Sequence, residues 1–332
     1  MKVIVKRFVA LVLMAGLLLP VFAARRVLDF PGENFSADLI YNENACPGDA
    51  LYVRLIFHGT SPESGKMFAG LSSELELFRG GKSVRKTSFF ELPSEETSYS
   101  RSFLAGVPLS TWWTESDKFS ADLDISVPGY GNRHISLPFS LTHKDFVSET
   151  IPLDDSNTAI KTDGSKARMN QIAKLNEILA TINPKSVYQD TPFAPPTPVV
   201  RRTSYFGDRR VFAYSSGGSS TSLHYGVDYG MPEGTEVKSC AAGKVVLSEW
   251  RNSTGWSIVI EHLPGLYSLY YHLSKMIVSE GDMVSEGQLI ALSGCTGLAT
   301  GPHLHWEMRL NGEAVNPNFF TGDFAFSDKK NW

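Results

Sequence analysis

Cysteine is scarce in this chain, with 3 among 332 residues: Cys46, Cys240 and Cys295. No two of them form a Cys-x-x-Cys pair, which excludes the thiolate zinc sites built on that spacing. The odd count leaves at least one thiol unpaired in an exported protein. A disulfide between Cys240 and Cys295 and a pair of reduced thiols are both compatible with the sequence.

Long hydrophobic runs are also missing. The apolar run at residues 8–19 is too short to span a bilayer comfortably. It follows three positive charges, and the small residues that a signal peptidase reads come after it, ending at Ala23. This order predicts a cleaved signal peptide at residues 1–23 and export to the periplasm or cell envelope. An uncleaved anchor is the alternative. After cleavage we expect no integral membrane span, and no cysteine follows the run to carry a lipid.

An excess of positive charge is absent. The formal net charge is −4, and loss of Lys2, Lys6 and Arg7 with the signal peptide takes it to −7. A mildly acidic protein offers no basic surface to nucleic acid or to anionic lipid. We therefore expect no nucleic-acid partner, while the oligomeric state stays open.

Helical periodicity is confined to one short part of the chain. Residues 24–153 instead show short alternating segments such as 51–58, the pattern of half-buried strands. The Gly80-Gly81 pair predicts a tight hairpin turn between two of them. A chain of this length favours two folded units, so we expect residues 24–153 to form a β-sandwich-like module. Its three histidines are scattered singly and predict no chemistry: His58, His134 and His143.

Residues 154–200 connect this module to the rest of the chain. Apolar residues at three- and four-residue steps from Met169 to Ile182 predict an amphipathic helix that ends at Pro184. Packing against a neighbouring domain is favoured over lying on a membrane. The Pro-rich stretch at 191–198 predicts an extended connector. From 201 to 320, strands and Gly or Pro turns predict a compact antiparallel β domain, followed by a tail at 321–332. The predicted fold class is mainly β.

Histidine, in contrast, is concentrated, because five of the eight lie in the last third of the chain. Four of them and one carboxylate have spacings typical of a metal site: His224, Asp228, His272, His303 and His305. A strand sends alternate side chains to one face, so His303 and His305 point together. An extended 224–228 segment would do the same for its two end residues, and Gly226 between them would leave open space. Imidazole and carboxylate are the ligands that zinc prefers where Cys is absent, so the sequence predicts a zinc site.

Two further polar residues lie close in sequence to the candidate metal-site residues. Glu307 falls on the same face as His303 and His305, where it would orient a metal ligand or form a structural salt bridge. His262 precedes the Pro264-Gly265 turn, and we expect a structural role for it.

Seven ordered blocks between residues 201 and 317 resemble the lysostaphin/LytM-type zinc metallo-endopeptidases, which cut peptidoglycan. The blocks are Phe206-Gly207-x-Arg209, His224-Tyr225-Gly226-Val227-Asp228-Tyr229, Gly234-Thr235-x-Val237, Tyr270-x-His272-Leu273, Gly281-Asp282-x-Val284-x-x-Gly287-Gln288, Gly294-x-Thr296-Gly297 and Thr300-Gly301-Pro302-His303-Leu304-His305. This resemblance covers about the last third of the chain. It implies that one Zn2+ is held by His224, Asp228 and His305, and that His303 and His272 act on the substrate.

The resemblance implies a hydrolase for peptide bonds of peptidoglycan, in a cross-link or a stem peptide. A zinc ion lowers the pKa of bound water to about 7. His303 is expected to act as general base and then protonate the leaving amine, and His272 to steady the oxyanion. The assignment of the two histidines could be reversed.

Two other functions were weighed against this one. A non-catalytic relative would bind or activate other cell-wall hydrolases, but that requires a broken ligand set, and this one is complete. A biotinyl or lipoyl carrier hairpin is suggested by residues 275–284, but a tight turn explains Gly281-Asp282 equally well, and a carrier needs no metal-type residues.

Overall fold

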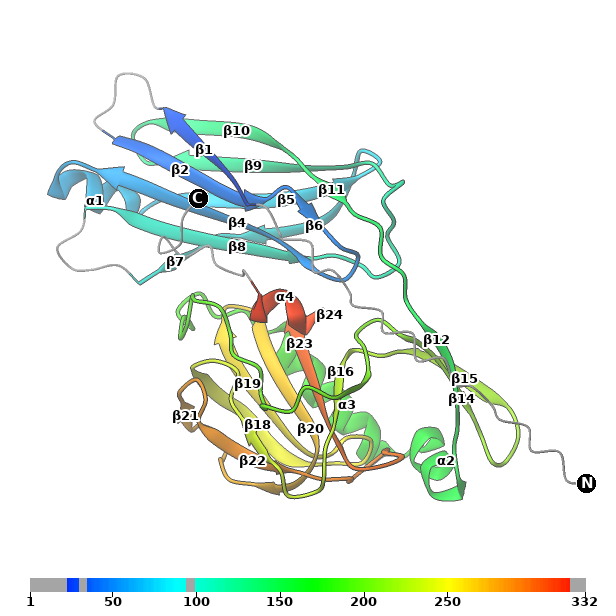
Figure 1. Ribbon diagram of the computed structural model, residues 1–332. Coiled ribbons are helices and arrows are strands. Elements are labelled where there is room, and N and C mark those ends of the chain that lie inside the picture. Colours follow the sequence, from blue (N-terminus) through cyan, green and yellow to red (C-terminus); the bar gives the residue numbers. More distant parts are fainter. Residues whose placement is uncertain (1–22, 30–34, 94–98, 323–332) are drawn as a thin grey trace, which may run out of the picture.

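The computed structural model describes residues 23–29, 35–93 and 99–322 (Figure 1). It is mainly β, as predicted, with strands in two regions joined by a short helical segment. The predicted signal peptide lies outside the described residues except for Ala23, which begins β1, and most of the predicted tail also lies outside them. In the described part of the chain, no helix has the length and apolar character needed to cross a membrane.

The first region is a sandwich of two antiparallel sheets. One sheet has the order β1 (Ala23–Asp29), β2 (Phe35–Asn42), β4 (Ala50–Gly59), β8 (Arg101–Pro108) and β7 (Phe90–Leu92). The other has the order β10 (Gly131–Pro138), β9 (Phe119–Val127), β5 (Ser72–Arg79) and β6 (Lys82–Ser88). Smaller elements are β3 (Asn44–Ala45), β11 (Ser140–Leu141) and helix α1 (Pro62–Phe68). This arrangement matches the predicted sandwich.

The hairpin turn between β5 and β6 forms where the sequence predicted it. Gly80 and Gly81 have φ of 56° and 77°. Two successive positive φ values are those of the type I′ turn, whose twist matches that of the paired strands.

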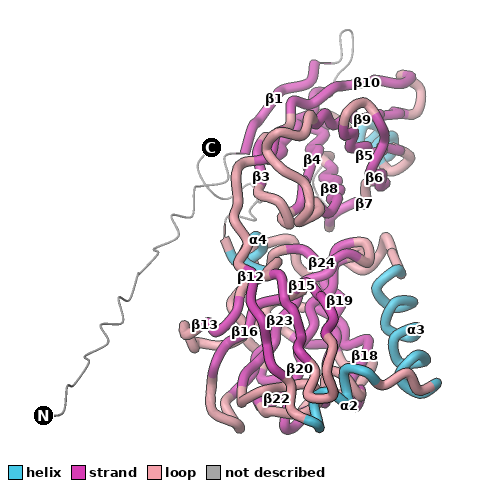
Figure 2. The backbone as a smooth tube through the Cα atoms, turned by 90° about the vertical axis from the view of Figure 1, so that its right-hand side faces the viewer, coloured by secondary structure: helices cyan, strands magenta, loops and turns pink. Residues whose placement is uncertain are grey.

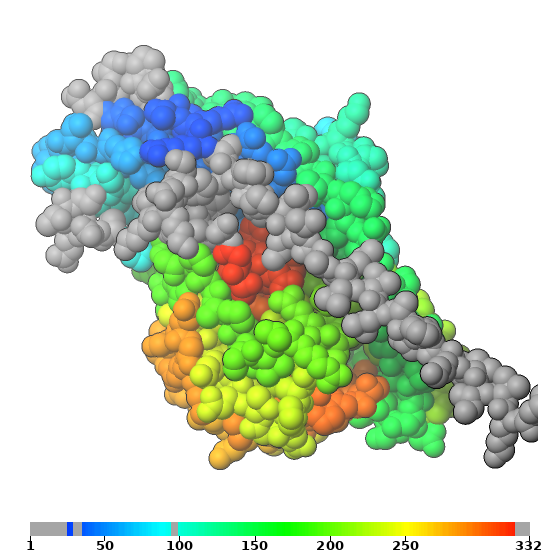
Figure 3. All heavy atoms as spheres, viewed as in Figure 1, coloured from blue at the N-terminus to red at the C-terminus, as the bar shows by residue number. Residues whose placement is uncertain are grey.

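Strand β4 differs from its prediction, because it is buried on both faces instead of one. Leu51, Val53 and Leu55 enter the core of the sandwich. Tyr52, on the other face, stacks on Phe319 of helix α4 (Pro317–Thr321) with ring centroids 6.1 Å apart. Helix α4 lies at the junction of the two regions in the space-filling view (Figure 3). The alternation of the sequence shows polarity along one strand but cannot show that a second domain covers the polar-looking face.

The connecting segment contains a strand and two helices: β12 (Ser148–Pro152), α2 (Asp155–Thr162) and α3 (Lys166–Ala180). Helix α3 is the predicted amphipathic helix, but it ends at Ala180 instead of at Pro184. It begins where the Ser165 hydroxyl accepts a hydrogen bond from the Arg168 amide at 3.2 Å. Its Leu175 and Leu179 pack against the second region, beside which it lies in Figure 2. Helix α2 was not predicted. The Pro-rich stretch lies against the second region, with the Phe193 amide bonded to the Phe320 carbonyl at 2.9 Å.

The second region is built on one large antiparallel sheet. Its main order is β13 (Arg202–Ser204), β16 (Gly226–Gly230), β23 (His303–Leu310), β20 (Leu266–Met276), β19 (Gly255–Leu263), β18 (Gly243–Arg251) and β21 (Met283–Val284). Three more strands join it: β17 (Glu236–Lys238), β22 (Leu289–Ser293) and β24 (Glu313–Val315). The hairpin of β14 (Arg209–Ala213) and β15 (Ser219–Leu223) forms a separate sheet. Strand β12 completes that sheet by pairing in parallel with β14.

Candidate metal centre

Two neighbouring strands bring the candidate ligands together. In the antiparallel pair β16–β23, Asp228 is directly opposite His305, and Gly230 is opposite His303. His224 comes before β16, in a loop whose backbone pairs with the loop at 207–208. The predicted extended segment 224–228 is therefore strand only from Gly226 onward. His224 nevertheless lies beside Asp228, because the loop turns its side chain toward the sheet.

The ligand atoms of His224, Asp228 and His305 meet in one buried place. These atoms all lie within 4.8 Å of one another. Oδ1 of Asp228 is 3.1 Å from Nε2 of His224 and 2.7 Å from Nδ1 of His305, and the two ring nitrogens are 3.0 Å apart. The exposed fractions of the three residues are 2%, 6% and 8%. Two imidazole nitrogens and one carboxylate oxygen form the kind of three-ligand set found at catalytic zinc.

The second polar atom of each candidate ligand has its own partner. Nδ1 of His224 donates to the Tyr205 carbonyl at 2.8 Å, and Nε2 of His305 lies 2.9 Å from Oε1 of Glu307. Oδ2 of Asp228 accepts from Arg210 at 2.9 Å. Such partners fix the tautomer and the orientation of metal ligands. The remaining ligand atom of each of the three side chains is thus directed at one point, which fits a metal ion.

Glu307 makes both of the contacts that its position on the strand suggested. It contacts His305 and also forms an ion pair with Arg309 at 2.6 Å. Burial alone would raise the pKa of Glu307, but Arg309 and His305 together lower it to about 2. The carboxylate is therefore charged at neutral pH, and it contacts the ring nitrogen of His305 that is opposite the candidate metal-binding nitrogen. Tyr271 packs flat on the same ring, with centroids 5.6 Å apart and planes within 4°.

His303 and His272 lie side by side next to the three ligands. Their ring centroids are 4.7 Å apart, and Nε2 of His303 is 3.8 Å from Oδ1 of Asp228. Nδ1 of His303 bonds to the Gly301 carbonyl at 2.8 Å, and Nδ1 of His272 bonds to the Thr296 carbonyl at 2.7 Å. A carbonyl only accepts, so each Nδ1 carries the hydrogen and each neutral ring has a lone pair at Nε2. Burial lowers the pKa of both rings, that of His272 to about 3.

The backbone at His272 is in the left-handed region, with φ of 61°. Such a conformation costs a non-glycine residue about 1–3 kcal/mol and is concentrated at functional sites. It occurs within β20 next to Tyr271, which is paired with His305. No sequence pattern predicted this conformation, because glycine is the residue type that normally signals a positive φ.

Gly226 is needed for a reason other than the expected one. A Cβ at this position would lie 2.2 Å from the Trp306 carbonyl oxygen and 2.9 Å from Cγ of Glu307. The prediction of open space beside the metal is therefore wrong. The glycine allows β16 and β23 to approach closely, and this approach brings Asp228 against His305.

Arg210 is the functional candidate that sequence reasoning missed. Its partner Asp228 is 18 residues away and on another sheet, so no local spacing could indicate the contact. His262 has the structural role expected of it: it is fully buried and bonds to the Ala242 carbonyl at 2.8 Å and to the Ser268 hydroxyl at 2.7 Å. All three cysteines are free, so Cys240 and Cys295 are not bridged.

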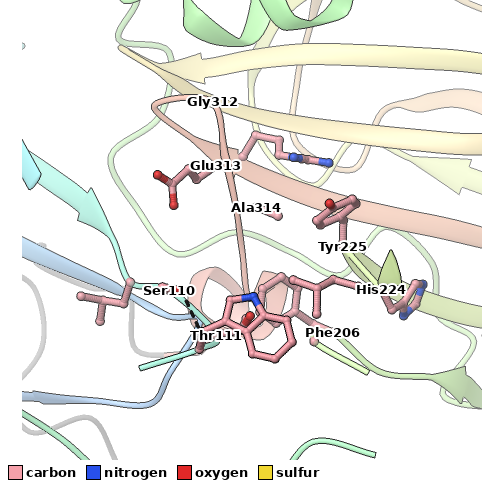
Figure 4. Close-up of a pocket in the computed structure, with 13 residues that line it drawn as sticks. Ser110, Thr111, Phe206, His224, Tyr225, Gly312, Glu313 and Ala314 are labelled. Carbon is pink, nitrogen blue, oxygen red and sulfur yellow. Dashed lines mark hydrogen bonds between the residues drawn. The ribbon is translucent and has the colours of Figure 1, made fainter. Parts of the chain in front are cut away.

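A cavity of about 310 Å³ lies between the two regions of the molecule. Figure 4 shows Ser110 and Thr111 of the sandwich facing Tyr225 and His224 across it. Of the three candidate ligands, only His224 lines this cavity. Asp228 and His305 are not among the residues that line the cavity.

The family model for peptidase family M23 matches residues 222–317. The chain is 43% identical over 95 residues to the DD-carboxypeptidase/endopeptidase Mpg of Neisseria meningitidis, a match covering 29% of this chain and 22% of that protein. It is also 43% identical over 97 residues to the murein hydrolase activator EnvC of Escherichia coli, covering 29% and 23%. The matches thus span less than a quarter of the length of these curated relatives.

A solved structure of a candidate peptidase M23 from Pseudomonas aeruginosa has a similar fold. The likeness covers 84% of this chain and 96% of that one, with a TM-score of 0.53 and 22% sequence identity. At this identity the likeness concerns the fold alone, but it extends over both regions. The family match at 222–317 contains all five candidate site residues. Residues 222–317 of this chain thus match a peptidase family M23 domain, as their resemblance indicated.

Proposed function

We propose that this chain is an exported, zinc-dependent endopeptidase that hydrolyses peptide bonds of peptidoglycan. The observation that carries the proposal is the convergence of His224, Asp228 and His305, each with its second polar atom already engaged. The similarity to Mpg, a DD-carboxypeptidase/endopeptidase that is 43% identical over 95 residues, supports the reaction class. Export is supported by the signal-peptide pattern of residues 1–23.

His224, Asp228 and His305 would hold one zinc ion, since they offer two imidazoles and a carboxylate and no thiolate. When bound, zinc supplies a Lewis acid and an activated water at neutral pH. Asp228 and Glu307 supply negative charge around the ion. Arg210 and the Tyr205 carbonyl keep the side chains of Asp228 and His224 from turning away.

His303 is the general base in this proposal. Its Nδ1 is committed to the Gly301 carbonyl, so Nε2 is the atom that accepts a proton from the attacking water. The charge that this ring then acquires is stabilised by Asp228, 3.8 Å away. The protonated ring returns the proton to the leaving amine, which completes hydrolysis.

His272 has a narrower role than the sequence suggested. With its hydrogen on Nδ1 and bonded to Thr296, the neutral ring offers only a lone pair at Nε2. It therefore accepts a hydrogen bond from water or from a substrate N–H group. It donates to an oxyanion only after it has itself been protonated, and burial opposes that step.

The proposal is tested by digesting purified peptidoglycan with the mature protein and identifying the fragments by mass spectrometry. We expect fragments with new amino and carboxyl ends, their loss with a chelator, and their return when zinc is added back. A His303→Ala protein should release fragments at least about 100-fold more slowly, whereas the matched surface variant His134→Ala should act like the parent. Undiminished release with chelator would contradict a zinc mechanism. A protein that binds zinc but releases nothing would instead favour a non-catalytic activator, the function named for EnvC.

A further inference from the structure

The connecting segment reaches the metal centre through a strand that lies outside the matched family region. Strand β12 pairs in parallel with β14, with Glu149 opposite Arg210. The Arg209 amide donates to the Val147 carbonyl at 2.7 Å, and the Leu153 amide to the Ala213 carbonyl at 2.8 Å. In Figure 1 β12 runs alongside β14 and β15, with α2 below them. The hairpin next to the metal ligands is therefore completed by residues that precede it by about sixty positions.

Three charged side chains continue this pairing to a metal ligand. Oε1 of Glu149 accepts from Nε of Arg210 at 3.0 Å, and Nη2 of Arg210 donates to Oδ2 of Asp228 at 2.9 Å. Exposure falls inward along the chain of contacts: the side chains are 37%, 15% and 8% exposed. The Ser204 hydroxyl also bonds to Arg210, and Ser204 is paired with Asp228 across β13 and β16.

Charge explains why Glu149 matters to the metal. A guanidinium beside Asp228 fixes the carboxylate, but its positive charge also opposes the approach of a divalent cation. Glu149 neutralises that charge and holds the long Arg210 side chain in place. Loss of Glu149 would remove both effects, and both losses weaken metal binding.

Helix α2 attaches the same segment to the tip of the hairpin. The Ser215 amide donates to the Thr158 hydroxyl at 3.1 Å, and Nζ of Lys161 lies 4.2 Å from the centre of the Phe212 ring. Asn157 donates to the carbonyl of Ala299, in the loop before His303, at 3.4 Å. The segment thus contacts the β14–β15 hairpin along its length and also the loop that precedes His303.

We propose that residues 148–162 are a positioning element of the metal centre, in which Glu149 holds Arg210 against Asp228 so that docking of β12 strengthens metal binding. This inference rests on the proposed zinc site. It makes the M23 region dependent on the connecting segment. Because coupling is reciprocal, bound zinc strengthens the docking of β12 by the same factor.

The test is a double-mutant cycle on the full mature chain, with zinc affinity measured by competition against a chromophoric chelator. We expect Glu149→Gln to weaken zinc binding about tenfold, at the low end of the range for groups that orient metal ligands. In an Arg210→Gln background the same change should have no further effect, because the contact to Asp228 is already lost. The control is Glu249→Gln, which breaks an ion pair between Lys174 of α3 and β18 with no route to the metal.

Hydrogen exchange gives a readout that does not depend on activity. Zinc should slow exchange of the amides in β12 of the parent protein, and Glu149→Gln should abolish most of that slowing. Equal effects of Glu149→Gln in both backgrounds, or no effect in either, would overturn the inference while leaving the zinc peptidase intact. A parent protein that binds no zinc would instead overturn the proposed function.

Discussion

The two regions of this molecule use histidine and carboxylate side chains in opposite ways. In the sandwich, each histidine is an exposed side chain that contacts a carboxylate: His58 with Asp38 at 2.9 Å, His134 with Asp124 at 2.8 Å, and His143 with Glu115 at 2.9 Å. The exposed fractions of these histidine side chains are 44%, 58% and 63%. In the second region, His224 and His305 meet one carboxylate, and their side chains are 2% and 10% exposed.

The difference shows that a histidine–carboxylate pair is not in itself a metal site. The histidine rings of the sandwich are largely exposed, so water competes with the carboxylates for each of them. The buried set has three ligand atoms directed at one point, with every second polar atom held by a neighbour. A metal centre requires this convergence, and the close approach of β16 and β23 at Gly226 provides it.

The largest effect is expected from changing the carboxylate that the two ligand histidines share. Asp228→Asn keeps the shape of the side chain but supplies a poor zinc ligand. The variant should lose the one equivalent of zinc that the parent binds. Peptidoglycan hydrolysis should fall by at least about 10³-fold, because the metal lowers the reaction barrier by several kcal/mol. Zinc content and initial rate measure this. The matched change Asp124→Asn, in a surface pair of the sandwich, should alter neither quantity, and equal losses in the two proteins would break the comparison.

His303→Ala should give the next largest effect and should separate the reaction from metal binding. Loss of a general base lowers kcat by about 10²–10⁴-fold. Zinc content should stay at one equivalent, because the three ligands are unchanged. Simultaneous loss of zinc and activity would show that His303 is a ligand instead.

Local sequence patterns predicted those features of the fold that depend on the residues of a single element. Alternation predicted β strands, Gly80-Gly81 predicted the hairpin, and the period from Met169 to Ile182 predicted α3. The patterns failed where another part of the chain determines the outcome. They could not show that α4 covers one face of β4, or that β12 pairs with β14 across the predicted boundary at 153.

The candidate site follows the same rule. The alternation of His303 and His305 and the resemblance to a known family predicted which residues come together. The five candidate site residues do lie together in the structure. Arg210 was not predicted, because its contacts join strands that are distant in sequence. Gly226 was identified, but with the wrong reason, since spacing cannot show what a missing Cβ would meet.

His262, a buried histidine of the second region, should make the stability of the protein depend on pH in a way that the exposed histidines of the sandwich do not. Burial lowers the pKa of this ring to about 4, against the small opposing effect of the Ala242 carbonyl. The unfolded ring titrates near 6.5, so the unfolded state binds more protons between these values. The stabilisation is present above pH 6.5 and is lost as pH falls toward 4, by about 3 kcal/mol. Urea unfolding of metal-free protein should show this extra loss in the parent relative to His262→Gln. An identical pH dependence in both proteins would contradict it.

The smallest effect is expected from His134→Ala in the sandwich. Asp124 raises the pKa of this exposed ring through a hydrogen bond, so its contribution has the opposite sign and is present at low pH. Solvent screens the pair, and we expect no measurable change in the urea midpoint at pH 7 or in zinc content. A clear destabilisation would show that the surface pairs have a structural role that their exposure does not indicate.

The most direct test of the account is the location of zinc. Crystals of the mature protein containing one equivalent of the metal would be examined by anomalous diffraction at the zinc edge. The account predicts a single strong peak between Nε2 of His224, Oδ1 of Asp228 and Nδ1 of His305. A peak at His58, His134 or His143 with none at the buried set would contradict it.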